Sequence, residues 1–155
     1  FVPWLFERLK RNNDGEKREV VRLTYIYFVV VLTGALLAFP LGTWLVTLIA
    51  GEQYAEAAPA FGWLALGQAL AGMYLMVTNY IFFSKQTGLL SVVTIASGLL
   101  NLILLVVLID YLGITGAAIA FAIAMALRFV LTWWVAQKRH PMPWSTPGFL
   151  VRNWN

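Results

Sequence analysis

The stretch 89–109, LLSVVTIASGLLNLILLVVLI, contains no Asp, Glu, Lys or Arg over 21 positions. A helix needs about 20 mostly apolar residues to cross a hydrocarbon core of roughly 30 Å. Its few polar residues, among them Ser91, Thr94 and Ser97, are of the small type that packed membrane helices use at their interfaces. This stretch therefore predicts a transmembrane helix.

Three further apolar runs flank this stretch, and only short polar segments separate the four. Loops this short make consecutive helices antiparallel neighbours. The predicted fold class is all-α, a polytopic membrane protein with four transmembrane helices. The predicted organisation is a cytoplasmic loop at 1–19, a transmembrane region at 20–137 with helices at about 20–50, 58–83, 89–109 and 114–136, and a cytoplasmic tail at 138–155.

The first run is longer than the membrane is thick, at roughly 1.5 Å per residue. Pro40 lies toward its outer end. A proline inside a helix removes one backbone donor and clashes with the preceding turn. We expect Pro40 to bend this helix and to act as a hinge.

The composition points to lipid as the solvent and excludes most enzymes. The chain is 61% hydrophobic and 12% charged, whereas soluble domains are about a quarter charged. A soluble helical bundle is the alternative, but it would show polar faces at helical spacing, and these runs are apolar all round. The chain has no cysteine, a single histidine at His140, no P-loop and no Ser-His-Asp set. We expect no enzyme activity, no cofactor, no metal and no nucleic-acid partner.

The distribution of positive charge predicts the orientation. Ten of the 11 Lys and Arg residues lie on one side of the predicted helices, and the other side carries only acidic residues. Cytoplasmic loops are the positively charged ones. Both ends of the chain are therefore expected in the cytoplasm. The cations are Arg8, Lys10, Arg11, Lys17, Arg18, Arg22, Lys85, Lys138, Arg139 and Arg152, and the acids opposite are Glu52, Glu56 and Asp110.

Arg128 is the exception, because it lies inside the last apolar run. It precedes Lys138 by ten residues, so it should lie roughly 15 Å into the membrane. An arginine there costs about 2.5–3.5 kcal/mol on insertion scales, which makes it a functional-site hypothesis. Asp110 is at the opposite boundary, so the counter-charge is either outside this chain or a ligand anion. The alternative is that Arg128 extends to the inner headgroups.

Three amides form a second group of candidate substrate-binding residues. Gln68 and Asn79 share one face of the second helix, and Asn101 lies deep in the third. Polar groups in lipid must face partners or water. Hydrogen bonding between packed helices is the alternative, and it remains open for all three.

The last helix carries a packing signal. Gly116, Ala120 and Ala124 form a ridge of small residues at four-residue spacing, and 118, 122 and 126 form another. Such ridges let neighbouring helices approach closely.

The order of these features resembles a known family. Pro40 is followed by GEQYAEA at 51–57, KQTG at 85–88, Asn101, and GITGAAIA at 113–120. This order resembles the C-terminal part of bacterial polysaccharide or O-antigen (Wzx-like) flippases. They belong to the multidrug/oligosaccharidyl-lipid/polysaccharide superfamily, which is MATE-like. The resemblance covers about residues 8–139.

The resemblance implies a multi-pass protein of the bacterial cytoplasmic (inner) membrane with two helical bundles around a cavity. Its cargo would be an oligosaccharide on a polyprenyl diphosphate, flipped for polysaccharide or lipopolysaccharide biosynthesis. This chain would be most of the second bundle, and its partners would be the lipid-linked oligosaccharide, membrane lipid and the N-terminal bundle of the same protein. Arg128 would meet the diphosphate. The chain begins with Phe1 rather than Met, and we expect it to be a piece of a longer transporter.

Three other functions stay open at this point. One is a non-transporting scaffold subunit whose polar residues only pack helices. Another is a drug or ion exporter of the same superfamily, although no acidic residue lies within the predicted helices. The last is a compact four-helix transporter that works as a dimer.

Overall fold

The computed structural model describes Glu7 and residues 14–83 and 88–139. Its elements are α2 (Asp14–Ala50), the 3-10 helix η1 (Glu52–Ala57), α3 (Ala58–Phe83) and α4 (Gly88–Arg139). The described residues are all-helical and contain no strand. Some of the predictions lie outside the described residues. They are those for residues 1–6, for 8–13, for the turn around 84–87 and for the tail from 140 onward.

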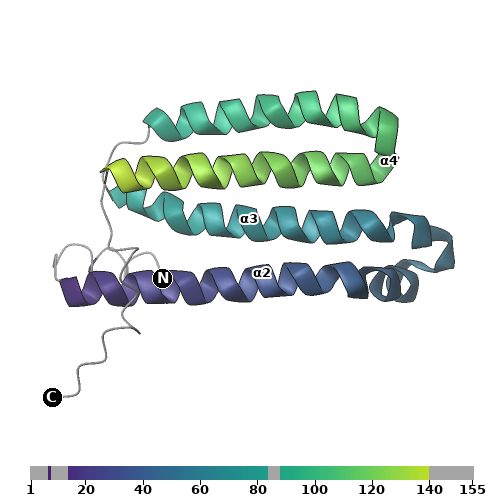
Figure 1. Cartoon of the computed structure of the whole chain (residues 1–155), viewed down its shortest axis with the longest axis horizontal. Coiled ribbons are helices and arrows are strands. Elements are labelled where there is room, and N and C mark those ends of the chain that lie inside the picture. The colour runs from purple at the N-terminus through teal and green to yellow at the C-terminus, as the bar shows by residue number, and fades with distance from the viewer. Residues whose placement is uncertain (1–6, 8–13, 84–87, 140–155) are drawn as a thin grey trace, which may run out of the picture.

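Helix α2 starts earlier than predicted, at Asp14 rather than at about residue 20. The prediction of a loop up to residue 19 was therefore wrong for 14–19. Hydropathy marks where the chain can enter lipid, whereas Glu, Lys and Arg are good helix formers and extend the helix beyond that point. Pro40 lies inside this 37-residue helix. Figure 1 shows the last turns of α2 departing from the line of its first part, as a proline bend predicts.

Helix α4 folds back on itself at Gly113. This residue has φ 57° and ψ −137°, a conformation inside the helix that only glycine adopts readily. Figure 1 shows two antiparallel arms side by side, a first arm at 88–112 and a second arm at 114–139. The turn predicted over 110–113 is thus confined to one residue. A Cβ at Gly116 would overlap the carbonyl oxygen of Leu108, so the arms touch backbone to backbone beside the reversal.

The segments lie in one row, with the second arm of α4 between the first arm and α3, and α2 on the other side of α3 (Figure 1). Close contacts at glycines hold α3 to both neighbours. The ring of Phe121 lies where a Cβ of Gly67 would be, and the ring of Phe39 packs on Gly62. Buried residues from α2, α3 and α4 form the apolar core: Val20, Val21, Phe28, Met73, Tyr74, Val77, Tyr80, Ile81, Leu90, Val93, Val135 and Ala136.

Three of the described helices are long and apolar enough to cross a membrane. Much of their apolar surface is not covered by the chain itself. On the first arm of α4, for example, Val92, Ile95 and Ile103 are each more than 60% exposed. Apolar surface of this extent needs lipid or another protein against it.

Hydroxyl groups inside the helices bond mostly to their own backbone, as a bilayer demands. Thr24 Oγ1 donates to the Val20 carbonyl at 2.9 Å and lies 3.0 Å from the hydroxyl of Tyr80, which links α2 to α3. Thr78 and Ser97 donate to carbonyls one turn earlier.

The described cations other than Arg128 gather at one end of the row, where Glu16 and Glu19 also lie. The start of α2, with Lys17, Arg18 and Arg22, lies at the same end as the end of α4, with Lys138 (Figure 1). Helix η1, which carries Glu52 and Glu56, lies at the opposite end with the α4 reversal. This arrangement matches the predicted division between a cationic and an acidic side.

Candidate functional site

Arg128 joins three helical segments. It lies on the second arm of α4 and is half-buried. Its Nη2 donates to the hydroxyl of Tyr74 on α3 at 2.9 Å, and to Oγ1 of Thr94 on the first arm at 3.1 Å. The side chain therefore faces the interior of the bundle, as the sequence predicts for a cation at this depth.

Neutral groups surround the charge. Arg128 Cζ lies 4.0 Å from the centre of the Tyr74 ring, a distance at which the negative ring face attracts a cation. Tyr74 is buried, so this contact is shielded from solvent. Within 14–83 and 88–139 no acidic side chain forms an ion pair with Arg128. The site thus keeps a net positive charge.

Two further polar atoms beside this charge have no partner. Arg128 Nε and Thr132 Oγ1 are buried and make no hydrogen bond. The two residues are four apart on one helix, so their side chains share a face. A guanidinium and a hydroxyl are both donors, and an oxyanion is the acceptor that uses them best. The donors gathered at this site are those that an anion would accept hydrogen bonds from.

Gln68 and Asn79 do not join this cluster. Gln68 lies seven residues before Leu75, and Asn79 lies four residues after it. At helical spacing these three residues share one face of α3. Tyr74 is one residue from Leu75 and hence about 100° away around the helix. Gln68 and Leu75 are exposed, and the Asn79 amide donates to the carbonyls of Leu75 and Met76 at 3.1 and 3.4 Å. Their role in substrate binding stays a prediction.

Asn101 is half-buried on the same face of α4 as Thr94. It lies seven residues further along, which is two turns or roughly 10 Å toward the acidic end. Asn101 and Arg128 are not hydrogen-bonded to each other in the structure. A shared ligand would have to extend over that distance.

The small residues of the last helix lie where the helices pack. Gly116, Ala120 and Ala124 are buried, and so are Ala118 and Ala122 of the second ridge. This burial agrees with their predicted role in helix packing.

The sequence did not single out Tyr74. It lies near the middle of α3. A phenol in the middle of an apolar run requires a polar partner when buried. That signal was present in the sequence, but the pairing with Arg128, 54 residues away, depends on the packing of α3 against α4.

Comparison of the chain with protein-family models, with curated proteins and with solved structures finds no match. In the part of the chain that the structure describes, no group of three or more His, Cys, Asp or Glu residues could hold a metal ion.

Proposed function

We propose that this chain is most of the C-terminal bundle of a MATE-like membrane transporter that flips an anionic, lipid-linked glycan across the bacterial cytoplasmic membrane. The cargo is an oligosaccharide on a polyprenyl diphosphate. In this proposal α2, α3 and the two arms of α4 each cross the membrane once. The reversal at Gly113 and the exposed apolar side chains of the first arm support four crossings.

The start of α2 and the end of α4 face the cytoplasm in this proposal. Lys17, Arg18 and Lys138 gather at one end, and Glu52 and Glu56 lie at the other. Positive charge is retained on the cytoplasmic side of membrane proteins.

The observation that carries the proposal is the unbalanced charge of Arg128. Its contacts are two hydroxyls and a ring face, and its Nε is free to donate. A diphosphate supplies the missing negative charge, and the planar guanidinium can bind two of its oxygens at once. The Tyr74 and Thr94 hydroxyls are weak partners that phosphate oxygens can displace.

A scaffold without transport activity is the second candidate. The fact in its favour is that both hydrogen bonds of Arg128 are internal and connect α3 with both arms of α4. In a scaffold, Arg128 would only hold these segments together.

Variants of Arg128 and of its partners separate the two functions. In the full-length transporter we expect Arg128→Ala to abolish export of the glycan, and Arg128→Lys to retain only part of it, because lysine lacks the fork. Tyr74→Phe and Thr94→Val free the guanidinium and should retain export. Arg22→Ala is the control, because it removes an exposed charge far from the cluster.

The measurement is the glycan at the cell surface together with the lipid-linked precursor retained inside, normalised to inserted protein. The flippase proposal predicts that precursor accumulates only in the Arg128 variants. Normal export by Arg128→Ala would eliminate the flippase mechanism. Equal loss in Arg128→Ala, Tyr74→Phe and Thr94→Val would favour the scaffold.

A further inference from the structure

A second polar feature lies at the cationic end of α4, apart from Arg128. A cavity of about 520 Å³ is lined by Leu89 at the start of the first arm, and by Trp134, Val135 and Lys138 at the end of the second. We refer to it as the Lys138 hollow. Its volume is in the range of small-molecule sites, roughly 300–1,000 Å³.

The lining of the hollow has an apolar and a cationic part. Val135 is buried, whereas Leu89 and Trp134 are 42% and 56% exposed. Lys138 is exposed, and its Nζ lies 3.6 Å from the centre of the Trp134 ring. This cation–π contact holds the ammonium over the hollow instead of leaving it to swing freely in solvent.

This combination has the chemistry of an amphiphile with an anionic head. Tryptophan and lysine near the end of an apolar helix lie at the level of lipid headgroups. Lys138 belongs to the cationic end of the row (Figure 1), which is the end that meets anionic lipids of the cytoplasmic leaflet. Basic pockets between transmembrane helices on that side bind anionic lipid headgroups.

We propose that the Lys138 hollow binds one anionic phospholipid. The lipid phosphate contacts the Lys138 ammonium, and an acyl chain lies against Leu89, Trp134 and Val135. The inference requires that α4 be embedded in a membrane, but it does not depend on the cargo proposed above.

Quenching of tryptophan fluorescence by brominated lipid tests this proposal. The protein is reconstituted in phosphatidylcholine vesicles that contain a minor fraction of brominated phosphatidylglycerol or of brominated phosphatidylcholine. The chain has seven tryptophans, so the difference between wild type and Trp134→Phe isolates the signal of Trp134. Trp133→Phe is the matched control, because Trp133 is the adjacent ring and does not line the hollow.

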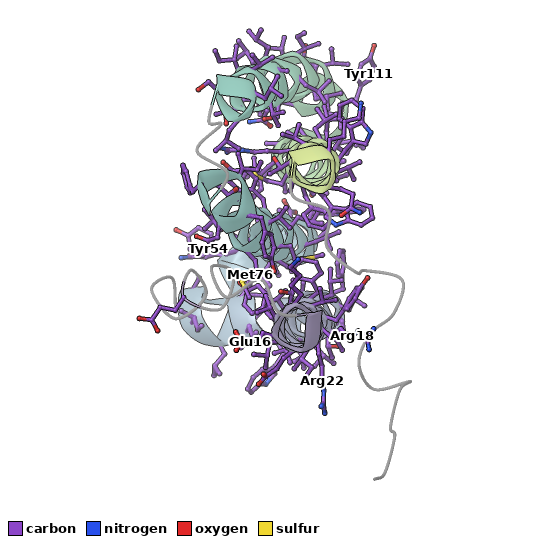
Figure 2. All side chains as sticks on the ribbon, turned by 90° about the vertical axis from the view of Figure 1, so that its left-hand side faces the viewer. Glu16, Arg18, Arg22, Tyr54, Met76 and Tyr111 are labelled. Carbon is purple, nitrogen blue, oxygen red and sulfur yellow. The ribbon has the colours of Figure 1, made fainter. Side chains whose placement is uncertain are left out.

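We expect brominated phosphatidylglycerol to quench the Trp134 signal at a lower mole fraction than brominated phosphatidylcholine does. One basic residue near an anionic surface corresponds to a preference of about fivefold. Lys138→Gln should remove this preference, whereas Lys138→Arg should retain it. Arg22→Gln should also retain it, because Arg22 carries the same charge on α2, on the opposite side of the row (Figure 2).

Three outcomes would overturn the proposal. Equal quenching of the Trp134 signal by the two lipids would show that no anionic lipid is selected. An equal loss of preference in Arg22→Gln and Lys138→Gln would show a general surface charge effect. Loss of the preference on addition of inorganic phosphate would assign the hollow to a soluble phosphate instead of a lipid. Failure of glycan export would leave all three results unchanged, so the two proposals are tested independently.

Discussion

Replacing Arg128 with methionine should change the stability of the bundle less than removing one oxygen from Tyr74. Arg128→Met removes the charge together with the need for it to be balanced. Tyr74→Phe leaves the charge in place and takes away a hydrogen bond that balances it. Both changes leave one group of the pair behind, but a buried guanidinium that loses a hydrogen bond costs more than a buried neutral hydroxyl that loses one.

The magnitudes follow from the contacts. A mid-membrane arginine costs about 2.5–3.5 kcal/mol. Against this stand two hydrogen bonds of Arg128, at about 0.6–1.7 kcal/mol each in a membrane protein, and one cation–π contact, at about 0.5–2 kcal/mol. At the midpoints of these ranges the favourable terms, about 3.5 kcal/mol, and the cost, about 3 kcal/mol, differ by about 0.5 kcal/mol. The Tyr74 hydroxyl that Arg128→Met leaves unpaired adds about 1 kcal/mol, so this variant should be only mildly destabilised. Tyr74→Phe loses one of these hydrogen bonds and also leaves a charged donor unsatisfied, so the penalty of the unsatisfied donor adds to the bond itself. We therefore expect it to lower the free energy of unfolding by about 1.5–3 kcal/mol.

The assay is unfolding of the purified protein by SDS in mixed micelles, followed by circular dichroism. Tyr111→Phe is the matched control, because Tyr111 is 83% exposed and should give no change. The reasoning fails if Arg128→Met destabilises the protein more than Tyr74→Phe does. Arg128 would then be a structural clamp whose hydrogen bonds exceed the cost of its charge.

Three other predictions concern packing, orientation and the hinge. Gly116→Val should destabilise the bundle by about 1–3 kcal/mol in the same assay, because its Cβ would overlap the Leu108 carbonyl. Gly98→Val is the control and should have almost no effect on stability, because a Cβ at Gly98 meets nothing within 4 Å. Equal effects of the two variants would contradict the close approach of the two arms. The chain has no cysteine, so cysteines introduced at Glu52 and Lys17 report orientation directly: an impermeant thiol reagent should label position 52 in intact cells and leave position 17 unlabelled, and the reverse pattern would overturn the topology. Pro40→Ala should straighten α2 and slow glycan export more than it lowers the amount of inserted protein; a proportional loss of both would mean that Pro40 is needed only for folding.

Much of the helical arrangement could be predicted from the sequence, because a segment that crosses a bilayer must be apolar over most of its length. The limits of α3 agree with the predicted run at 58–83. The start of α2 could not be predicted in the same way, because charged helix formers continue a helix beyond the apolar region. The predicted acidic loop at 51–57 contains η1 for a related reason, since short polar segments form 3-10 turns at helix ends.

The candidate site could be predicted only as an anomaly. A single arginine in an apolar run is visible in the sequence, because its cost is independent of what surrounds it. Its partners are not visible, because Tyr74 and Thr94 lie 54 and 34 residues away and are ordinary residues in their own helices. Gln68 and Asn79 are visible in the sequence by their polarity, but Gln68 is exposed and the Asn79 amide donates to carbonyls of its own helix.

The identity of those partners decides what Arg128 can do. A carboxylate would neutralise the guanidinium and occupy its fork, and an anionic cargo would then have to displace a charged competitor. Tyr74 and Thr94 instead supply neutral oxygens, and Nε and Thr132 Oγ1 have no partner. The hydrogen bonds that Tyr74 and Thr94 accept from Arg128 reduce the cost of inserting the cation without removing its charge. A charge held in this manner attracts anions over a longer range than a paired one, because the low dielectric of the bundle screens it weakly. Arg128 has no acidic partner in the part of the chain that the structure describes, and this is the physical basis for proposing that it binds a diphosphate.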